Sequence, residues 1–403
     1  MNLKNIILIC CMCVNFSCSK NENIQLLLKD NVEFASKQFD LRIGEIEKRN
    51  KLINPVTLDR QGNLISCEYS DWRSGFFPGS LWYLYELSNN SKYLDWAKRY
   101  TNEIIEAKDI TWSHDVGFII GCSFGNGYRL EKDSLYKSVI IDAAKSLITR
   151  FKPQIGVLQS WDVSNGWQSK RGWECPVIID NMMNLELLFL ASKLSGDSIY
   201  YNIAVSHANR TLVDFFRSDG SCYHVVDYSL KDGSVRKKQT AQGYNNESIW
   251  SRGHAWAIYG YVACFRETRD SKYLTQAIKT FNMLKSHPDL PFDCIPYWDM
   301  STPDIPNTPR DVSAAACIAS ALYELASFDC IKESNYYVNY ADSIMRSLSS
   351  DAYRAKVGTN AYFLLLHSVG SVPHGAEIDV PLNYADYYFL EAIQRRERLL
   401  VGK

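Results

Sequence analysis

"CPVIIDNMMNLELLFLAS", residues 175–192, joins a short apolar run to a long apolar helix, and one acidic residue, Asp180, lies at the junction. Helices commonly begin at Asp, Asn, Ser or Thr just before an apolar periodicity. After Asp180 the apolar residues recur at i, i+4, i+7 and i+11, the spacing of one helix face: Met183, Leu187, Leu190 and Leu194. The stretch therefore predicts a mostly apolar, internal helix that begins at Asp180.

Asp180 has two interpretations. Its carboxylate suits a helix N-cap, because it accepts the unpaired amide protons of the first turn. However, Pro176 and three apolar residues precede it, which predicts a position inside the protein. A buried carboxylate has either a partner or a shifted pKa. Asp180 is therefore both a candidate structural cap and a candidate catalytic group.

The composition limits the kind of protein. With 403 residues, of which 46% are hydrophobic, the chain can bury a large core. The net charge of −1 argues against nucleic acid, because an acidic ligand would have to be held by a few local cations. Aromatic residues make up 13% of the chain, with ten Trp and 25 Tyr, which is typical of sites where sugar rings lie against flat side chains.

The N-terminal residues have the features of an export signal. Lys4 is followed by an apolar run over residues 6–14, which is too short to span a bilayer. Ser17 before Cys18 predicts lipoprotein processing, with Cys18 as the lipidated first residue. We therefore expect a signal at residues 1–18, a linker at 19–30 and one domain at 31–400. The protein would be exported, either periplasmic or anchored to a membrane only through Cys18.

The remaining Cys and the His residues show no metal-binding pattern. Eight Cys outside the signal have no CxxC spacing and are expected to be small buried residues: Cys67, Cys122, Cys175, Cys222, Cys264, Cys294, Cys317 and Cys330. The seven His form no HExxH, and no calcium loop or glycine-rich phosphate loop occurs. The sequence therefore predicts no metal and no cofactor.

A weak internal repeat predicts the architecture. Four segments share a polar start, a Tyr and an Ala four residues later: NSKYLDWA (90–97), GDSIYYNIA (196–204), RDSKYLTQA (269–277) and SNYYVNYA (334–341). DSLYKSVI (133–140) is a degenerate copy. Tyr and Ala at i, i+4 share a helix face, so each copy predicts an amphipathic helix that packs closely at the Ala.

A more apolar helical stretch precedes each copy. These stretches are 76–87, 117–126, 181–194, 252–267 and 313–327, and further helices are expected around 31–50 and 384–396. Six pairs of one apolar and one amphipathic helix predict an all-α fold, a closed (α/α)6 barrel with the apolar helices inside. An open solenoid is the alternative, but the copies are unevenly spaced. Residues 221–240 alternate around Asp232 and Gly233 and predict a local β-hairpin.

Closure of the barrel would bring the starts of the inner helices to one rim. Those starts are rich in polar and aromatic residues: DWRSGFFPG (71–79), WSHDVGF (112–118), IIDNMMN (178–184), WSRGHAW (250–256), PRDVSAA (309–315) and PLNYADYY (381–388). Asp115 is the second carboxylate here, either a helix cap or a group that faces Asp180; in the second case repulsion and burial would raise the pKa of one of the two, and the pair would titrate as a unit. Asp311 precedes SAAA and is expected to cap a tightly packed helix.

Other rim residues also have two interpretations. Arg252 lies between Trp250 and Trp256, which suits a guanidinium held to grip a carboxylate, but an ion pair with an internal acid such as Asp180 is the alternative. Trp72, Trp161 and Trp256 suit ring stacking or the core. His224, on the predicted hairpin, is a better ligand candidate than His207, which falls inside an outer helix.

Together these motifs resemble unsaturated glucuronyl hydrolases of glycoside hydrolase family 88. The resemblance runs in order from about Asp71 to Ala392 and is carried by DWRSGFFPGSLW, HDVGF, QSWD, VIIDNMMNLELL, SHANRT, TAQGY, SIWSRGHAWAIYG, PYWD, PRDVSAAA and AEIDVPLNYADYYFLEA. It implies an (α/α)6 barrel that removes the unsaturated uronic acid left by polysaccharide lyases at the non-reducing end of oligosaccharides, by hydrating the C4=C5 double bond.

The resemblance also implies residue roles. Asp180 resembles the acid that protonates C4 and then draws a proton from water, and Asp115 resembles the second essential carboxylate. Positions that resemble binding residues are His114, Phe118, Trp72, Trp161, His224, Thr240, Gln242, Arg252 and Trp256. His254 departs from the Gln expected between Gly253 and Ala255, which we expect to tune contacts at the rim.

Several functions remain open from the sequence. A neighbouring (α/α)6 hydrolase acting on unsaturated rhamnogalacturonan disaccharides is the main alternative, and a direct two-carboxylate glycosidase is another. A non-catalytic surface glycan-binding lipoprotein would need aromatic residues but no convergent acid pair. Residues 367–379 contain no basic residue besides two His, so no strong sulfate clamp is expected there. The partner would be an unsaturated uronate-containing oligosaccharide, and the protein a monomer or weak dimer.

Overall fold

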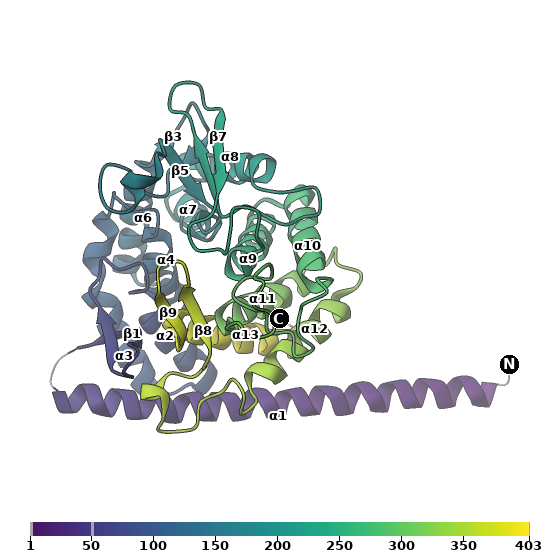
Figure 1. Ribbon diagram of the computed structural model, residues 1–403. Coiled ribbons are helices and arrows are strands. Elements are labelled where there is room, and N and C mark those ends of the chain that lie inside the picture. Colours follow the sequence, from purple (N-terminus) through teal and green to yellow (C-terminus); the bar gives the residue numbers. More distant parts are fainter. Residues whose placement is uncertain (1–2, 50–51, 403) are drawn as a thin grey trace.

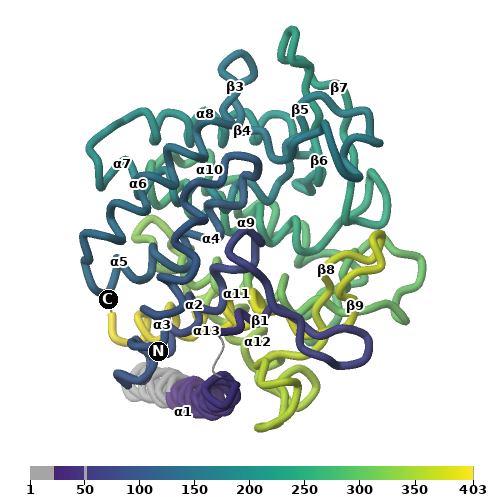
Figure 2. Tube along the Cα trace, turned by 90° about the vertical axis from the view of Figure 1, so that its left-hand side faces the viewer, coloured from purple at the N-terminus to yellow at the C-terminus, as the bar shows by residue number. Residues whose placement is uncertain are grey.

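Two concentric rings of helices make up the protein in the computed structural model, which describes residues 3–49 and 52–402, with side chains from residue 22 onward (Figures 1 and 2). The inner ring in this described part consists of α2 (Phe76–Ser88), α4 (Val116–Ile120) with α5 (Asn126–Glu131), α7 (Asn181–Ser195), α9 (Ser251–Thr268), α11 (Val312–Ala326) and α13 (Asn383–Leu400). Each inner helix contacts the next, and α13 packs on α2, so the ring is closed. The predicted (α/α)6 barrel is confirmed.

The outer ring contains the repeated segments. It consists of α1 (Leu3–Arg49), α3 (Ser91–Glu103), α6 (Ser134–Ile148), α8 (Ser198–Asp214), α10 (Ser271–Lys285) and α12 (Ser334–Leu348). In four of these helices the polar residue that opens the repeat is the N-cap, and its side chain accepts an amide proton of the first turn: Asn90, Asp133, Asp197 and Asp270. The Ala of each full repeat is buried against the inner ring, as the shared face predicts: Ala97, Ala204, Ala277 and Ala341.

The inner helices are buried nearly all round because outer helices cover one side and the opposite inner helices the other. All but one residue of α11 is buried, and its small Ala side chains let neighbouring helices approach closely. The inner helix predicted at residues 117–126 is instead divided by a π-helical turn at Gly121–Gly125. Sequence periodicity could not show this division, because the turn changes hydrogen bonding and not the apolar pattern.

In the described part of the chain, short strands lie at one end of the barrel. β5 (Cys175–Ile178), β6 (Val225–Tyr228) and β7 (Val235–Gln239) form an antiparallel sheet in that order, which Figure 1 shows at the top. The hairpin predicted at residues 221–240 is therefore confirmed, and β5 joins it. Three further hairpins were not predicted: β1–β2 (Asn54–Leu58, Leu64–Cys67), β3–β4 (Phe151–Lys152, Val157–Leu158) and β8–β9 (Ser368–Ser371, Ala376–Val380). Short 3₁₀ turns occur at Ile105–Asp109, Gln168–Arg171 and Asn360–Tyr362.

The N-terminal boundary differs from the prediction. The expected linker at residues 19–30 belongs to α1, and Ile24 and Leu28 lie in the hydrophobic core. Their apolar spacing on one helix face explains why this segment packs on the barrel. The side chain of Cys18 lies outside the described residues, so the structure does not bear on lipidation. No helix in the described part of the chain is long and apolar enough to cross a bilayer.

Candidate active site

Both candidate carboxylates are at N-cap positions of adjacent inner helices, Asp115 before α4 and Asp180 before α7. Neither side chain makes a capping hydrogen bond. An N-cap Asp normally accepts a first-turn amide proton, so the purely structural interpretation of Asp180 and Asp115 is not what the geometry shows. The two carboxylates are left available at the same end of the barrel, where α4 and α7 contact each other.

The surroundings of Asp180 favour its protonated form. Its side chain is 14% exposed, and its Oδ2 is buried without a hydrogen-bond partner among the described residues. Burial raises the pKa of Asp180 to about 7, Arg252 acts in the opposite direction, and the charge of Asp115 adds to the increase. A carboxylic acid with a pKa near neutrality is suited to give and take back a proton.

His224 directs an N–H at Asp180. The backbone amides of Ala241 and Gln242 donate to His224 Nδ1 at 3.1 and 3.2 Å, so Nδ1 is unprotonated. Burial lowers the pKa of His224 well below its ordinary value, so the ring is neutral and its proton is on Nε2. Nε2 is 3.7 Å from Asp180 Oδ2, which is longer than a hydrogen bond, and neither atom has a hydrogen-bond partner in the described structure. The sheet β5–β6–β7 thus places a neutral donor beside the acid.

Asp115 has its own histidine. The Ser113 hydroxyl donates to Asp115 Oδ2 at 2.7 Å, and His114 Nε2 is 3.3 Å from Asp115 Oδ1. His114 is fully buried, and burial lowers its pKa although Asp115 opposes this. A backbone bridge between Ser113 and Trp161 holds this segment against the loop before β5. Asp115 is 19% exposed, so it faces the open side of the site.

The predicted aromatic residues line this end of the barrel. Phe118 contacts Trp72 and Trp256 edge-on, with ring centroids 5.6 and 5.5 Å apart. Trp161 is half-buried, and its ring is 6.1 Å from that of His224. Thr240 and Gln242 follow β7, where Gln242 is half-buried and the Thr240 hydroxyl accepts the Gly243 amide at 2.8 Å. The structure therefore brings all the predicted site residues to one region.

Arg252 is more constrained than the sequence suggested. It is 2% exposed and pairs with Asp311 at 3.2 Å, and it donates to the carbonyls of Val369 and Gly370. The internal acid that it pairs with is thus Asp311, not Asp180. Asp311 also caps α11 through the Ser313 amide, as predicted. Arg252 remains close enough to lower the pKa of Asp180, so its charge acts on the site.

His254 bonds backbone groups through both of its ring nitrogens. It is 1% exposed, with Nδ1 at 2.8 Å from the Trp250 carbonyl and Nε2 accepting the Cys222 amide at 3.0 Å. Burial lowers its pKa to about 4. His254 therefore has no free ring nitrogen for a ligand and can act on the rim only through Trp250 and Cys222, which it holds.

The sequence missed several residues at this end. Tyr384 is fully buried, its ring is 5.0 Å from that of Trp72 and tilted by 40°, and its hydroxyl has no hydrogen-bond partner among described residues. Arg171 lies over Trp173 at 4.9 Å and donates to the Thr240 carbonyl, with no carboxylate partner in the described structure. His374, on the β8–β9 hairpin, contacts Trp167 at 5.0 Å. The contacts of these three residues come from segments that are distant in the sequence. Tyr384 alone could have been noticed, because it lies in PLNYADYY, one of the helix starts predicted at the rim.

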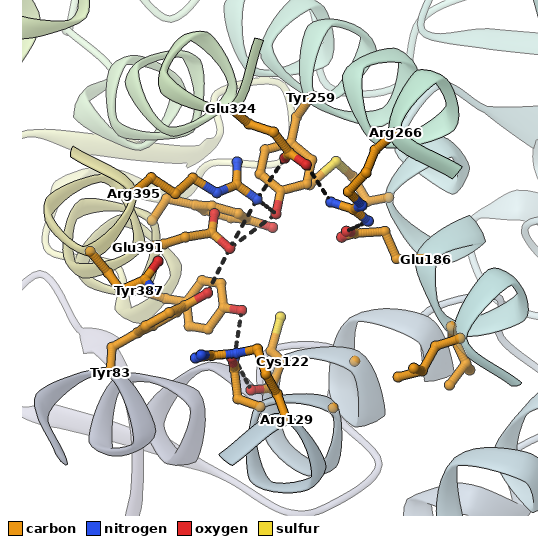
Figure 3. Close-up of a pocket in the computed structure, with 18 of the residues that line it drawn as sticks. Tyr83, Cys122, Arg129, Glu186, Tyr259, Arg266, Glu324, Tyr387, Glu391 and Arg395 are labelled. Carbon is orange, nitrogen blue, oxygen red and sulfur yellow. Dashed lines mark hydrogen bonds and ion pairs between the residues drawn. The ribbon is translucent and has the colours of Figure 1, made fainter. Parts of the chain in front are cut away.

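A separate cavity of about 430 Å³ occupies the other half of the barrel, lined by the C-terminal parts of the inner helices (Figure 3). Glu391 accepts the hydroxyls of Tyr83 and Tyr259 at 2.7 and 3.0 Å. Arg266 pairs with three glutamates from different helices, Glu186, Glu267 and Glu324. The cations and carboxylates that line this cavity are thus paired with each other, and these ion pairs connect the ends of neighbouring helices. Phe118 lies between this cavity and the catalytic end.

No group of three His, Cys, Asp or Glu in the described residues is arranged to hold a metal ion. The eight Cys with described side chains are free, five of them buried.

A closed (α/α)6 barrel with two uncapped carboxylates and aromatic side chains at one rim suits a glycoside hydrolase, in which a pair of carboxyl groups acts on a sugar ring. The model of Glycosyl Hydrolase Family 88 matches residues 50–388, and the chain belongs to this family.

Known proteins resemble the chain over most of its length. An unsaturated glucuronyl hydrolase of Formosa agariphila is 47% identical, over 82% of this chain and 81% of the relative. The crystal structure of an unsaturated glucuronyl hydrolase specific for heparin has a TM-score of 0.88 and 39% identity, covering 93% of this chain and 98% of the other. A mutant unsaturated glucuronyl hydrolase from Streptococcus agalactiae, complexed with dGlcA-GalNAc6S, has a TM-score of 0.74 and 27% identity, covering 92% and 91%.

Proposed function

We propose that the protein is an unsaturated glucuronyl hydrolase that releases the terminal 4,5-unsaturated uronic acid from lyase-generated oligosaccharides. The observation that carries this proposal is the buried, partner-free Oδ2 of Asp180, whose pKa is raised to about 7 beside a second carboxylate. Hydration of a vinyl ether needs one acid that can return as a base, and a fixed environment that keeps its pKa near neutrality.

The chemistry follows from the position of Asp180. Protonated Asp180 gives its proton to C4, and the positive charge that develops at C5 is stabilised by the ring oxygen. The Asp180 carboxylate then takes a proton from water as the water oxygen bonds to C5. The resulting hemiketal opens and expels the remaining sugar from C1. The His224 Nε2–H faces the carboxylate across 3.7 Å, which is longer than a hydrogen bond, and it would donate to the ionised carboxylate after an approach of about 0.7 Å.

Asp115 and the aromatic residues fit roles in holding the substrate. Asp115 is exposed enough to accept a sugar hydroxyl, and Ser113 fixes its second oxygen. Trp161 is half-buried at the open side and suits stacking against a sugar ring. Arg252 contributes its positive charge to a site that receives a uronate carboxylate.

We propose glycosaminoglycan-type disaccharides as the substrate class, which the relatives named for heparin and bound to dGlcA-GalNAc6S support. The test is a panel of lyase-generated disaccharides, sulfated and unsulfated, with pectin-derived unsaturated rhamnogalacturonan disaccharides and saturated analogues. Loss of the ultraviolet absorbance of the conjugated uronate reports turnover. Glycosaminoglycan disaccharides should react fastest, and activity should fall as the pH rises through about 7, because Asp180 must be protonated. Comparable cleavage of saturated substrates would exclude hydration, and preference for the pectin fragment would exclude this substrate class.

We also propose that the protein is exported and lipidated at Cys18. Lys4, the short apolar run at 6–14 and Ser17 before Cys18 support this. Mass spectrometry of the mature N-terminus should find a lipid on Cys18. An unmodified N-terminus at another residue would defeat this part and leave the enzymatic proposal intact.

A further inference from the structure

Asn184 is a fully buried amide between the two carboxylate-bearing helices. It lies on the first turn of α7, four residues after Asp180, and packs against Gly117 of α4. A Cβ on Gly117 would overlap Asn184, so glycine is needed there for the close approach of α4 and α7. The side chain of Asn184 therefore has a fixed place against the beginning of α4.

Asn184 caps α4 from the neighbouring helix. The first amides of a helix have no intrahelical partner, and the N-cap side chain commonly accepts one of them. In α4 the N-cap residue Asp115 makes no such bond. Instead, Asn184 Oδ1 accepts the Phe118 amide at 2.8 Å. Because Asn184 satisfies this donor, the carboxylate of Asp115 need not turn back toward the helix.

The same amide sets the proton of His114. With Oδ1 on the Phe118 amide, the Nδ2 group of Asn184 faces His114 Nδ1 at 3.1 Å and donates to it. A neutral imidazole that accepts at Nδ1 carries its proton on Nε2. That nitrogen is 3.3 Å from Asp115 Oδ1. Asn184 thereby does for His114 what two backbone amides do for His224, so both carboxylates face an Nε2–H.

We propose that Asn184 is a positioning residue for the reaction. By capping α4 in place of Asp115 and by donating to His114 Nδ1, it holds Asp115 turned toward the substrate with a neutral N–H donor beside it. This inference rests on the proposed function, but its structural part, the tautomer of His114, can be measured without any substrate.

Three other side chains affect the pKa of His114, and the test must separate their effects from that of Asn184. Burial lowers the pKa of His114, Asp115 and the Asn181 side chain favour its protonated form, and Arg150 disfavours it. Asn181 donates its own amide protons to the Leu158 carbonyl and the Ser160 hydroxyl. None of these groups donates to Nδ1, so Asn184 is the donor that leaves Nδ1 bare, and the Asp115 carboxylate 3.3 Å from Nε2 favours the same tautomer.

The first experiment is ¹⁵N NMR of the full-length protein labelled in histidine, with His114 assigned by the loss of its signals in His114→Gln. We expect a neutral ring with Nδ1 bare in the wild type. In Asn184→Asp one carboxylate oxygen still accepts the Phe118 amide, so the fold is kept, but the other oxygen cannot donate. Nδ1 should then become protonated. Protonated Nδ1 in the wild type, or no change in Asn184→Asp, would overturn the proposal even if the enzyme is active.

The second experiment is kinetic and compares Asn184→Asp and Asn184→Leu with Asn126→Leu. Asn126 is a matched control, a buried amide that bonds the Cys122 carbonyl and the Tyr387 hydroxyl on the far side of Phe118. We expect kcat to fall about 10- to 100-fold in both Asn184 variants, the range for lost outer partners of a catalytic group. The pH profile of Asn184→Asp should also move, because a charge is added beside His114.

Asn126→Leu should keep kcat and its pH profile while losing melting temperature. A merely structural Asn184 would behave in the same way, so equal kcat in folded Asn184→Asp and the wild type would overturn the proposal. If the wild type itself cleaves no unsaturated disaccharide, the proposed function fails, and the NMR result still decides the role of Asn184.

Discussion

Asp180→Asn should change activity and stability in opposite directions. Burial raises the pKa of Asp180 from 3.8 to about 7, against the effect of Arg252. At about 1.4 kcal/mol per pH unit, this difference corresponds to a folding penalty of up to about 4 kcal/mol for the ionised carboxylate. Asn keeps the shape and removes the charge. We therefore expect the variant to be more stable than the wild type at pH 8, with kcat lowered at least about 10²-fold.

The pH dependence of this stability difference has a defined sign. A group whose pKa is raised by folding contributes stability below its unfolded pKa and loses that contribution as the pH rises through the folded value. The wild type should therefore lose stability relative to Asp180→Asn between about pH 4 and 7. Urea unfolding at pH 5 and pH 8 should show a difference at pH 5 that is less than half of that at pH 8.

Asp386→Asn provides the matched control. Burial also raises the pKa of Asp386 to about 7, but this carboxylate accepts the amides of Leu364 and Leu365 at 2.9 and 3.1 Å. Asn would turn an NH₂ group toward one of these donors, so Asp386→Asn should lose stability and keep kcat. Near-normal kcat in Asp180→Asn, or a stability difference from the wild type that is equal at pH 5 and pH 8, would refute the reasoning for Asp180.

Three further predictions follow from charged residues. Arg252→Ala should raise KM for the unsaturated uronate and lower stability by about 3 kcal/mol, because Asp311 would be left buried and unpaired; an unchanged KM in the folded variant would contradict a role in binding. Arg266→Gln should lower stability by about 2 kcal/mol, discounted because Arg266 is 31% exposed. Without the Arg266 cation the pKa of Glu324 should rise above its unfolded value. The loss of stability relative to the wild type, measured by thermal melts, should therefore be largest above pH 6 and smaller near pH 4. A loss that does not depend on pH would argue against the charge network. Arg171 has no carboxylate partner in the described structure, so its cation is available to a sulfate group. Arg171→Gln should therefore lower kcat/KM several-fold for sulfated disaccharides and little for unsulfated ones. Equal losses of kcat/KM on both substrates would mean that Arg171 has only a structural role.

Local sequence determined the helices and the ends at which chemistry is placed. The Tyr-to-Ala spacing and polar caps such as Asp197 depend on contacts within one or two helical turns, so they can be predicted from the sequence alone. Asp115 and Asp180 were identified for the same reason, since each lies where an apolar helix begins. Ring closure then follows from six such pairs, because each apolar helix can be buried only by its neighbours.

The partner of each of these residues depends on how distant segments pack together. The cap of α4 comes from Asn184, 66 positions from the amide it accepts, and the partner of Arg252 is Asp311 and not Asp180. Such pairings depend on the angle and depth at which the helices pack, which no local periodicity records. Sequence therefore determined where the two carboxylates lie, and packing decided that both are free of capping bonds and that each lies beside a buried histidine.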